Sequence, residues 1–112
     1  MKFYGNLYVS ESLEKKKDKI IEKLKSEKFQ LNCYVIALTE NPRNQVEFFD
    51  SILLMQKNYK KENLFIAGIA NCYDEALLLV QKMVEDAYLQ KGNADIRSYM
   101  LEKQKEFDES RV

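Results

Sequence analysis

The sequence predicts an α/β domain, a small three-layer sandwich with a mostly parallel sheet of three or four strands and helices on both faces. Two short apolar runs, residues 33–38 and 64–70, have the length and composition of strands buried on both faces. Segments with helical spacing alternate with such runs, a pattern typical of strands joined by right-handed crossovers. The predicted order is β-α-β-β-α-β-α-α, in a single domain over residues 1–112.

The composition is that of a globular protein and argues against several functions. Hydrophobic residues make up 46% of the chain and charged residues 32%. Lys+Arg and Asp+Glu number 18 each, so the chain lacks the excess positive charge usual in nucleic-acid binders. No apolar run approaches the ~20 residues of a membrane span, and the N-terminus lacks the apolar segment of a signal peptide. The two cysteines are therefore expected to be reduced thiols in the cytoplasm.

The chain contains no histidine, which excludes Ser-His-Asp and Cys-His catalysis and removes the commonest zinc ligand. Neither a glycine-rich phosphate loop nor a CxxC or HExxH motif is present. We therefore name no catalytic residue, no cofactor and no metal, and the sequence favours a protein that is not an enzyme.

In the N-terminal half, residues 3–9 have the aromatic and β-branched composition of a strand. Gly5 and Asn6 interrupt it, which predicts a bulge or an edge position. Two serines that follow are candidate N-caps of a helix extending to about Lys28, whose narrow apolar stripe places it on the surface. After the second strand, residues 41–44 have the composition of a type I turn.

The segment 46–63 has two interpretations. It is either one helix, or a strand over 46–50 that pairs antiparallel with the preceding strand and leads into a short helix capped by Asp50 or Ser51 and ending near Lys60. In a single helix the apolar side chains would point almost all round the axis. The hairpin divides them between two elements, so it is the favoured interpretation.

The strand at 64–70 is expected to lead directly into the longest helix, with Asn71 as its N-cap and Gly92 just beyond its end. A wide apolar stripe with spacing i, i+3, i+4, i+7 is expected to face the core. Three leucines outside that stripe predict that more than one face is covered. The stripe comprises Tyr73, Ala76, Leu77, Val80, Met83, Val84, Ala87 and Tyr88, and the leucines are Leu78, Leu79 and Leu89.

The C-terminal segment 92–112 is predicted to form a last helix capped by Asn93 or Asp95, with a frayed end. Its apolar positions are few, which suggests an oligomerisation or docking arm. A homodimer is favoured, because most soluble oligomers are two-fold dimers. The candidate interface residues are Ile96, Tyr99, Met100 and Phe107.

A ligand site would be expected where parallel strands end, beyond their carboxyl ends. Cys72 is the sharpest candidate there, because a thiol in the first turn of a helix can be activated by backbone dipoles. The adjoining backbone amides could also hold a small anion. The simpler interpretation of Cys72 is a small residue at a tight junction. Cys33 and Gly68 are interpreted as packing residues. The candidate ligand-binding residues are Ser10, Glu11, Thr39, Glu40, Asn71, Cys72 and Tyr73.

Three functions follow from these observations. The first is a small cytoplasmic protein-interaction or regulatory module that is not an enzyme and acts as a homodimer. The second is anion binding or thiol chemistry around Cys72. The third is weak nucleic-acid binding through the lysine-rich first helix, with Tyr4, Tyr8 or Tyr34 stacking on bases; the acidic residues among those lysines count against it.

Overall fold

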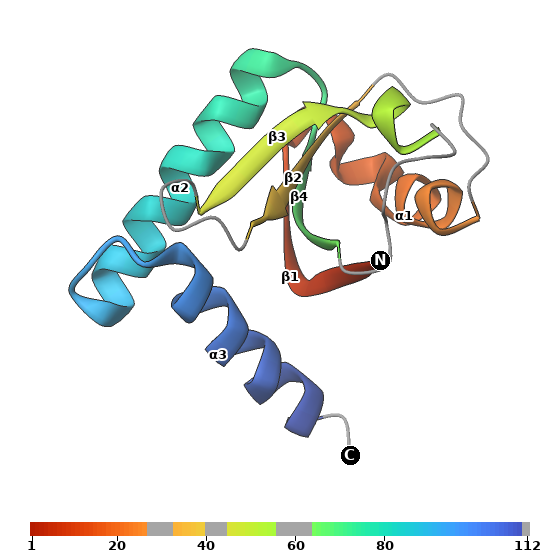
Figure 1. Ribbon diagram of the computed structural model, residues 1–112. Helices are drawn as coiled ribbons and strands as arrows, with labels where there is room; N and C mark the ends of the chain where they lie inside the picture. Colours follow the sequence, from red (N-terminus) through yellow and green to blue (C-terminus); the bar gives the residue numbers. More distant parts are fainter. Residues whose placement is uncertain (27–32, 40–44, 56–63, 111–112) are drawn as a thin grey trace.

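The computed structural model describes residues 1–26, 33–39, 45–55 and 64–110 (Figure 1). The predicted turn at 41–44 and the expected helix ends near Lys28 and Lys60 lie outside these residues. The elements in chain order are strand β1 (Lys2–Val9), 3₁₀ helix η1 (Glu11–Lys16), helix α1 (Lys17–Lys25), strand β2 (Tyr34–Leu38), strand β3 (Val46–Asp50), 3₁₀ helix η2 (Ser51–Met55), strand β4 (Phe65–Ala70), helix α2 (Tyr73–Lys91) and helix α3 (Ile96–Ser110).

The four strands form one mixed sheet in the order β1-β4-β2-β3, which confirms an α/β domain. The prediction of a mostly parallel sheet is wrong. Only β1 and β4 are parallel, whereas β2 is antiparallel to both β4 and β3. The helix between β1 and β2, α1, is nine residues or about 14 Å long, and this length alone does not determine the direction of β2. Tyr34 at the start of β2 pairs with Ala70 at the end of β4, so the chain re-enters the sheet at the end where it left β1.

Each face of the sheet carries a hydrophobic cluster, because successive strand residues point to opposite sides. In β2, Val35 and Ala37 join the cluster that includes Leu13, Ile20 and Leu24 of η1 and α1. Ile36 joins the cluster on the other face, which is completed by α2 and α3. Figure 1 shows α1 and α2 on opposite sides of the sheet.

The two central strands agree with the sequence. Residues 66–70 of β4 are all buried, as are Val35, Ile36 and Ala37 of β2. Gly68 confirms the expected close packing of a helix on the sheet. A Cβ there would lie 3.2 Å from the terminal methyl of Met83 on α2 and 2.9 Å from the backbone oxygen of Tyr8.

The two outer strands also match their predictions. β1 lies at one edge of the sheet and its pairing with β4 shifts register between Phe3 and Tyr8, which confirms both an edge position and a bulge. At the other edge, β3 pairs antiparallel with β2, so the hairpin interpretation is confirmed. Asp50 accepts a hydrogen bond from the backbone N–H of Ile52 at 3.0 Å and so supports the start of η2.

The ends of α2 and α3 show which local signals were correctly interpreted. Gly92 has φ 74° and is the left-handed residue that ends α2, as predicted. Asp95 caps α3 by accepting a hydrogen bond from the backbone N–H of Ser98 at 3.1 Å. Asn71 is not the cap of α2; that position belongs to Cys72, whose side chain makes no capping hydrogen bond.

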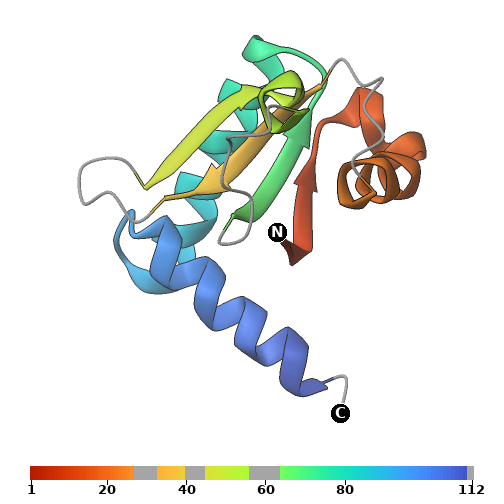
Figure 2. The ribbon, with the colours of Figure 1, turned by 45° about the vertical axis from the view of Figure 1, so that its right-hand side comes forward.

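The last helix packs on its own chain. Figure 2 shows α3 running from the end of α2 across the lower end of the sheet, and it contacts both α2 and β1. Its buried side chains are Ile96, Met100 and Gln104, spaced one turn apart along a single stripe.

Candidate functional site

The parallel strands β1 and β4 end side by side, and there the structure brings together five of the predicted site residues. Ser10, directly after β1, is buried, and its hydroxyl oxygen accepts a hydrogen bond from the backbone N–H of Asn71 at 3.2 Å. The backbone N–H of Ser10 in turn donates to the carbonyl of Ile69 at 3.1 Å. These bonds join the two strand ends, so Ser10 has a structural role. Glu11, Cys72 and Tyr73 lie exposed around this junction.

Cys72 has an exposed free thiol at the start of α2. Its Sγ lies 3.6 Å from Oε2 of Glu75, to which it donates a hydrogen bond. Ser12 also donates to Glu75, with its Oγ 3.0 Å from Oε1. The carboxylate of Glu75 therefore lies beside the first turn of α2, where an anionic ligand would have to bind, and its charge opposes anion binding.

Thr39 is not part of this site. β2 is antiparallel to β4, and Leu38 pairs with Phe65 at the start of β4. The carboxyl end of β2 is therefore at the opposite end of the sheet, where the backbone N–H of Thr39 donates to the carbonyl of Gln45 at 2.9 Å. Glu40 lies outside the described residues. The expectation failed because it assumed that β2 runs parallel to its neighbours.

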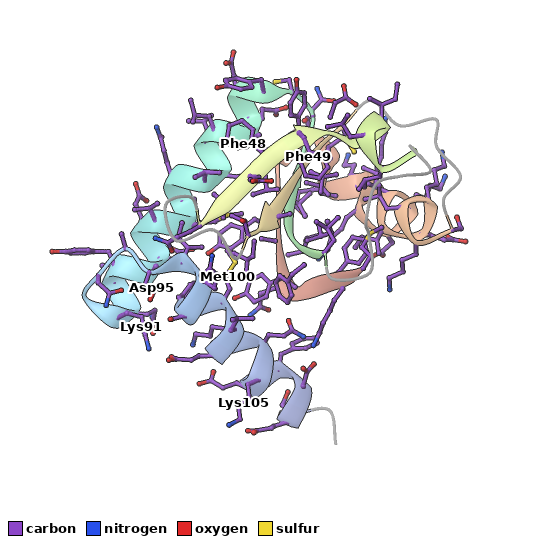
Figure 3. All side chains as sticks on the ribbon, in the orientation of Figure 1. Phe48, Phe49, Lys91, Asp95, Met100 and Lys105 are labelled. Atoms are coloured by element: carbon purple, nitrogen blue, oxygen red, sulfur yellow. The ribbon has the colours of Figure 1, made fainter. Side chains whose placement is uncertain are left out.

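Tyr73 points away from the strand ends and packs toward β3. Its ring centroid is 5.1 Å from that of Phe48 on β3 and 6.2 Å from that of Tyr34 on β2. Figure 3 labels Phe48 and Phe49, which occupy opposite faces of β3; Phe48 is on the α2 side. Tyr73 is nevertheless 54% exposed, so most of its ring remains in contact with solvent.

The wide apolar stripe predicted for α2 is divided in the structure. Ala76, Met83 and Ala87 are buried against the sheet, as expected. Four other members of the stripe lie on the side of the helix that faces β3 and remain accessible to solvent. We call Tyr73, Leu77, Val84 and Tyr88 the flank stripe; their exposed fractions are 54%, 41%, 37% and 62%. Two leucines on a further face, Leu78 and Leu89, are also exposed, so the expected cover on more than one face of α2 is not found there.

The residues proposed for a dimer interface on α3 lie largely inside the chain's own fold. Ile96 and Met100 are buried in the cluster beneath α2 and α3 (Met100 is labelled in Figure 3). Tyr99 and Phe107 are partly buried. Phe107 packs directly over Gly5 of β1, where an added Cβ would lie 2.6 Å from the ring. A partner that needed Ile96 or Met100 would first have to displace α3.

The structure also reveals polar contacts that sequence reasoning missed. The hydroxyl of Tyr8 donates to Oδ2 of Asp86 on α2 at 2.5 Å, and burial together with that carboxylate raises the pKa of Tyr8 well above its usual range. Oε1 of Gln104 accepts the backbone N–H of Gly5 at 2.6 Å, in the bulged part of β1. Gln104 lies one turn after Met100, and this polar residue in line with the apolar positions of α3 was the one sequence signal for the contact.

The lysine-rich region of η1 and α1 offers little support for nucleic-acid binding. A hollow of about 450 Å³ lies beside α1 and is lined by Asp18, Glu22 and Lys25 as well as Ile21 and Ser26. Two carboxylates accompany its single lysine. Tyr4, one of the proposed stacking rings, is 3% exposed and lies in the core, so it has no accessible face to stack on a base.

The described residues contain no group of three or more Cys, Asp or Glu side chains arranged to hold a metal ion. Of the helices in the same residues, none has the length and apolar character needed to cross a membrane. No protein-family model matches this chain, and no curated protein or solved structure is significantly similar to it.

Proposed function

We propose that this chain is a protein-interaction or regulatory module that is not an enzyme and acts as a homodimer. The observation that carries the proposal is the flank stripe on α2. Its two tyrosines and two aliphatic side chains recur along the same side of the helix, and all four are more than a third exposed. Contiguous apolar surface of this kind on a folded domain is characteristic of a protein-contact site.

The composition of the flank stripe also suits a contact surface. Tyrosine is enriched in protein interfaces, because it offers a large apolar ring with a polar hydroxyl and loses little conformational freedom on binding. The alternative site at the strand ends has weaker support. Its thiol donates to Glu75 and its serine hydroxyl ties β1 to β4, so these groups already have partners. The sequence also offers no histidine to act as a base beside Cys72.

The proposal includes a cytoplasmic location, where two free thiols remain reduced. In that compartment a small module can act by pairing with itself and presenting its remaining surface to a further partner.

Sedimentation velocity over a wide range of protein concentrations tests self-association. We expect a concentration-dependent shift from monomer to dimer that resists added salt, because the flank stripe is apolar and uncharged. A single monomer boundary at every concentration would contradict the proposed homodimer. A dimer that dissociates in moderate salt would point to charged side chains instead.

A further inference from the structure

The α2 side of the sheet is unevenly covered. α2 packs on β4 and β2, and α3 packs on β1 and on α2. At the other edge, Val46 and Phe48 of β3 face the same side as α2 and are only partly buried. The flank stripe of α2 lies beside them, and Tyr73 of this stripe contacts Phe48. These two surfaces form an L-shaped shelf, with β3 as its floor and the flank stripe as its wall.

The shelf has the width of a helix. Neighbouring strands lie about 4.8 Å apart, whereas packed helices lie about 8–10 Å apart. One helix therefore covers about two strands, and α2 is centred over β4 and β2. A second helix placed next to α2 would lie over β3, against both floor and wall.

We propose that α2 of a second copy of this chain occupies the shelf, while α2 of the first copy occupies the shelf of the second. This inference rests on the proposed homodimer and specifies its interface. A two-fold contact uses the same surface on both partners, so that surface must be complementary to itself. The shelf meets this requirement, because one edge of the molecule carries both a helix with an exposed apolar stripe and a strand face that is only partly covered.

The exposed area is consistent with a weak dimer. At roughly 200 Å² for a complete tyrosine side chain, Tyr73 and Tyr88 together leave about 230 Å² in water per chain. A standard stable interface buries about 800 Å² per partner. The two rings supply more than a quarter of this. Leu77 and Val84 are only 41% and 37% exposed, and Val46 and Phe48 are mostly buried, so the apolar surface of the shelf falls short of this standard area. When each α2 occupies the shelf of the other copy, both β3 and the flank stripe become covered in each copy. A contact between the two flank stripes alone would leave β3 exposed.

A matched pair of charge substitutions tests the position of the interface. Tyr88→Lys places a lysine on the flank stripe, whereas Leu89→Lys places the same group on the next residue, about 100° round the helix. Leu89 is 80% exposed and Tyr88 62%, so both side chains lie mainly in solvent in the single chain, and a lysine at either position should leave the fold intact. We expect Tyr88→Lys to raise the dimer dissociation constant about tenfold or more and Leu89→Lys to leave it within about twofold of wild type.

Cross-linking tests whether α2 of one copy lies over β3 of the other. Both proteins carry Cys72→Ser; one also carries Val46→Cys on β3, and the other Gln81→Cys on the exposed side of α2. Cys33 is buried and stays out of the reaction. We expect a short bismaleimide to join the two proteins when they are mixed, and a mixture with Leu89→Cys in place of Gln81→Cys to react much less.

The outcomes separate the two proposals. A dimer that tolerates Tyr88→Lys as well as Leu89→Lys, with no preference for the Val46→Cys and Gln81→Cys pair, overturns the shelf contact and leaves the homodimer standing. Equal weakening by both lysines also overturns the shelf contact. A chain that stays monomeric at all concentrations overturns both proposals.

Discussion

The ring of Phe107 on α3 lies directly over Gly5 on β1. A Cβ added at position 5 would meet ring carbons at 2.6 to 2.8 Å, closer than any ordinary contact. The backbone N–H of Gly5 meanwhile donates to Oε1 of Gln104, one turn earlier on the same helix. Because position 5 has no side chain, α3 can pack on the edge strand β1, and Gln104 can accept the N–H of Gly5 in the bulge.

Gly5→Ala is therefore expected to destabilise the fold by about 1–3 kcal/mol, the usual cost of forcing an extra methyl into a packed site. The ring can give way only by turning or by shifting α3, which also carries the Gln104 oxygen that accepts the backbone N–H of Gly5. Urea unfolding followed by circular dichroism measures the change in the free energy of unfolding.

The control is the same substitution in a Phe107→Ala background. With the ring absent, Gly5→Ala should become neutral or slightly stabilising, because alanine restricts the unfolded chain more than glycine does. The two changes should therefore couple by roughly 1–3 kcal/mol in a double-mutant cycle. Purely additive effects would show that α3 does not rest on Gly5.

The central part of the fold could be predicted from sequence, because its signals are local. The apolar runs of β2 and β4, the interruption of β1 at Gly5 and the left-handed Gly92 each act within a few residues. Strand direction could not be predicted this way. It depends on the end at which the chain re-enters the sheet, and a short helix such as α1 is compatible with either direction.

The candidate site was likewise predictable where its signals were local and unpredictable where it depended on strand direction. Ser10 and Cys72 were correctly placed near each other, because β1 and β4 are parallel neighbours. Thr39 was misplaced by the error in strand direction. The exposed half of the α2 stripe was read as core, because periodicity reveals which residues share a face but not how much of that face a small sheet can cover. Tyr73 and Ala76 have equivalent spacing signals and opposite environments.

The N-terminus of α3 provides a second prediction. Asp95 accepts the backbone N–H of Ser98 at 3.1 Å with Oδ1 and the Ser98 hydroxyl at 2.9 Å with Oδ2. Asp95→Ala should cost about 1 kcal/mol in the free energy of unfolding, the typical value of an N-cap. Asp95→Asn keeps a side-chain oxygen for the amide and should recover most of the loss.

The same bonds to Ser98 lower the pKa of the Asp95 carboxyl, with the backbone amide as the main cause. A lowered pKa in the folded state means that the contribution is present above the unfolded value of about 3.9 and disappears as the pH falls through the folded value. The stability difference between wild type and Asp95→Ala should therefore shrink in acid. A difference that stays constant down to strongly acidic pH would indicate that the cap does not depend on the carboxylate.

Tyr4 provides the opposite dependence, at alkaline pH. Burial, and to a smaller extent the neighbouring Tyr99, raises the pKa of Tyr4 from 10.0 to about 12. Between these values the unfolded chain has released the phenolic proton while the folded chain still holds it. The free energy of unfolding is therefore little affected below about pH 10 and falls by about 1 kcal/mol per pH unit from this group as the pH rises toward 12. Tyr4→Phe has no proton to lose, so its stability relative to wild type should improve by that amount between about pH 10 and pH 11. Urea unfolding of both proteins across this range measures the difference. Tyr88→Phe removes the hydroxyl of an exposed ring and should lose stability in parallel with wild type. If Tyr4→Phe did the same, the phenol of Tyr4 would have to ionise as readily in the folded chain as in the unfolded one, and its burial in the cluster beneath α2 and α3 would be wrong.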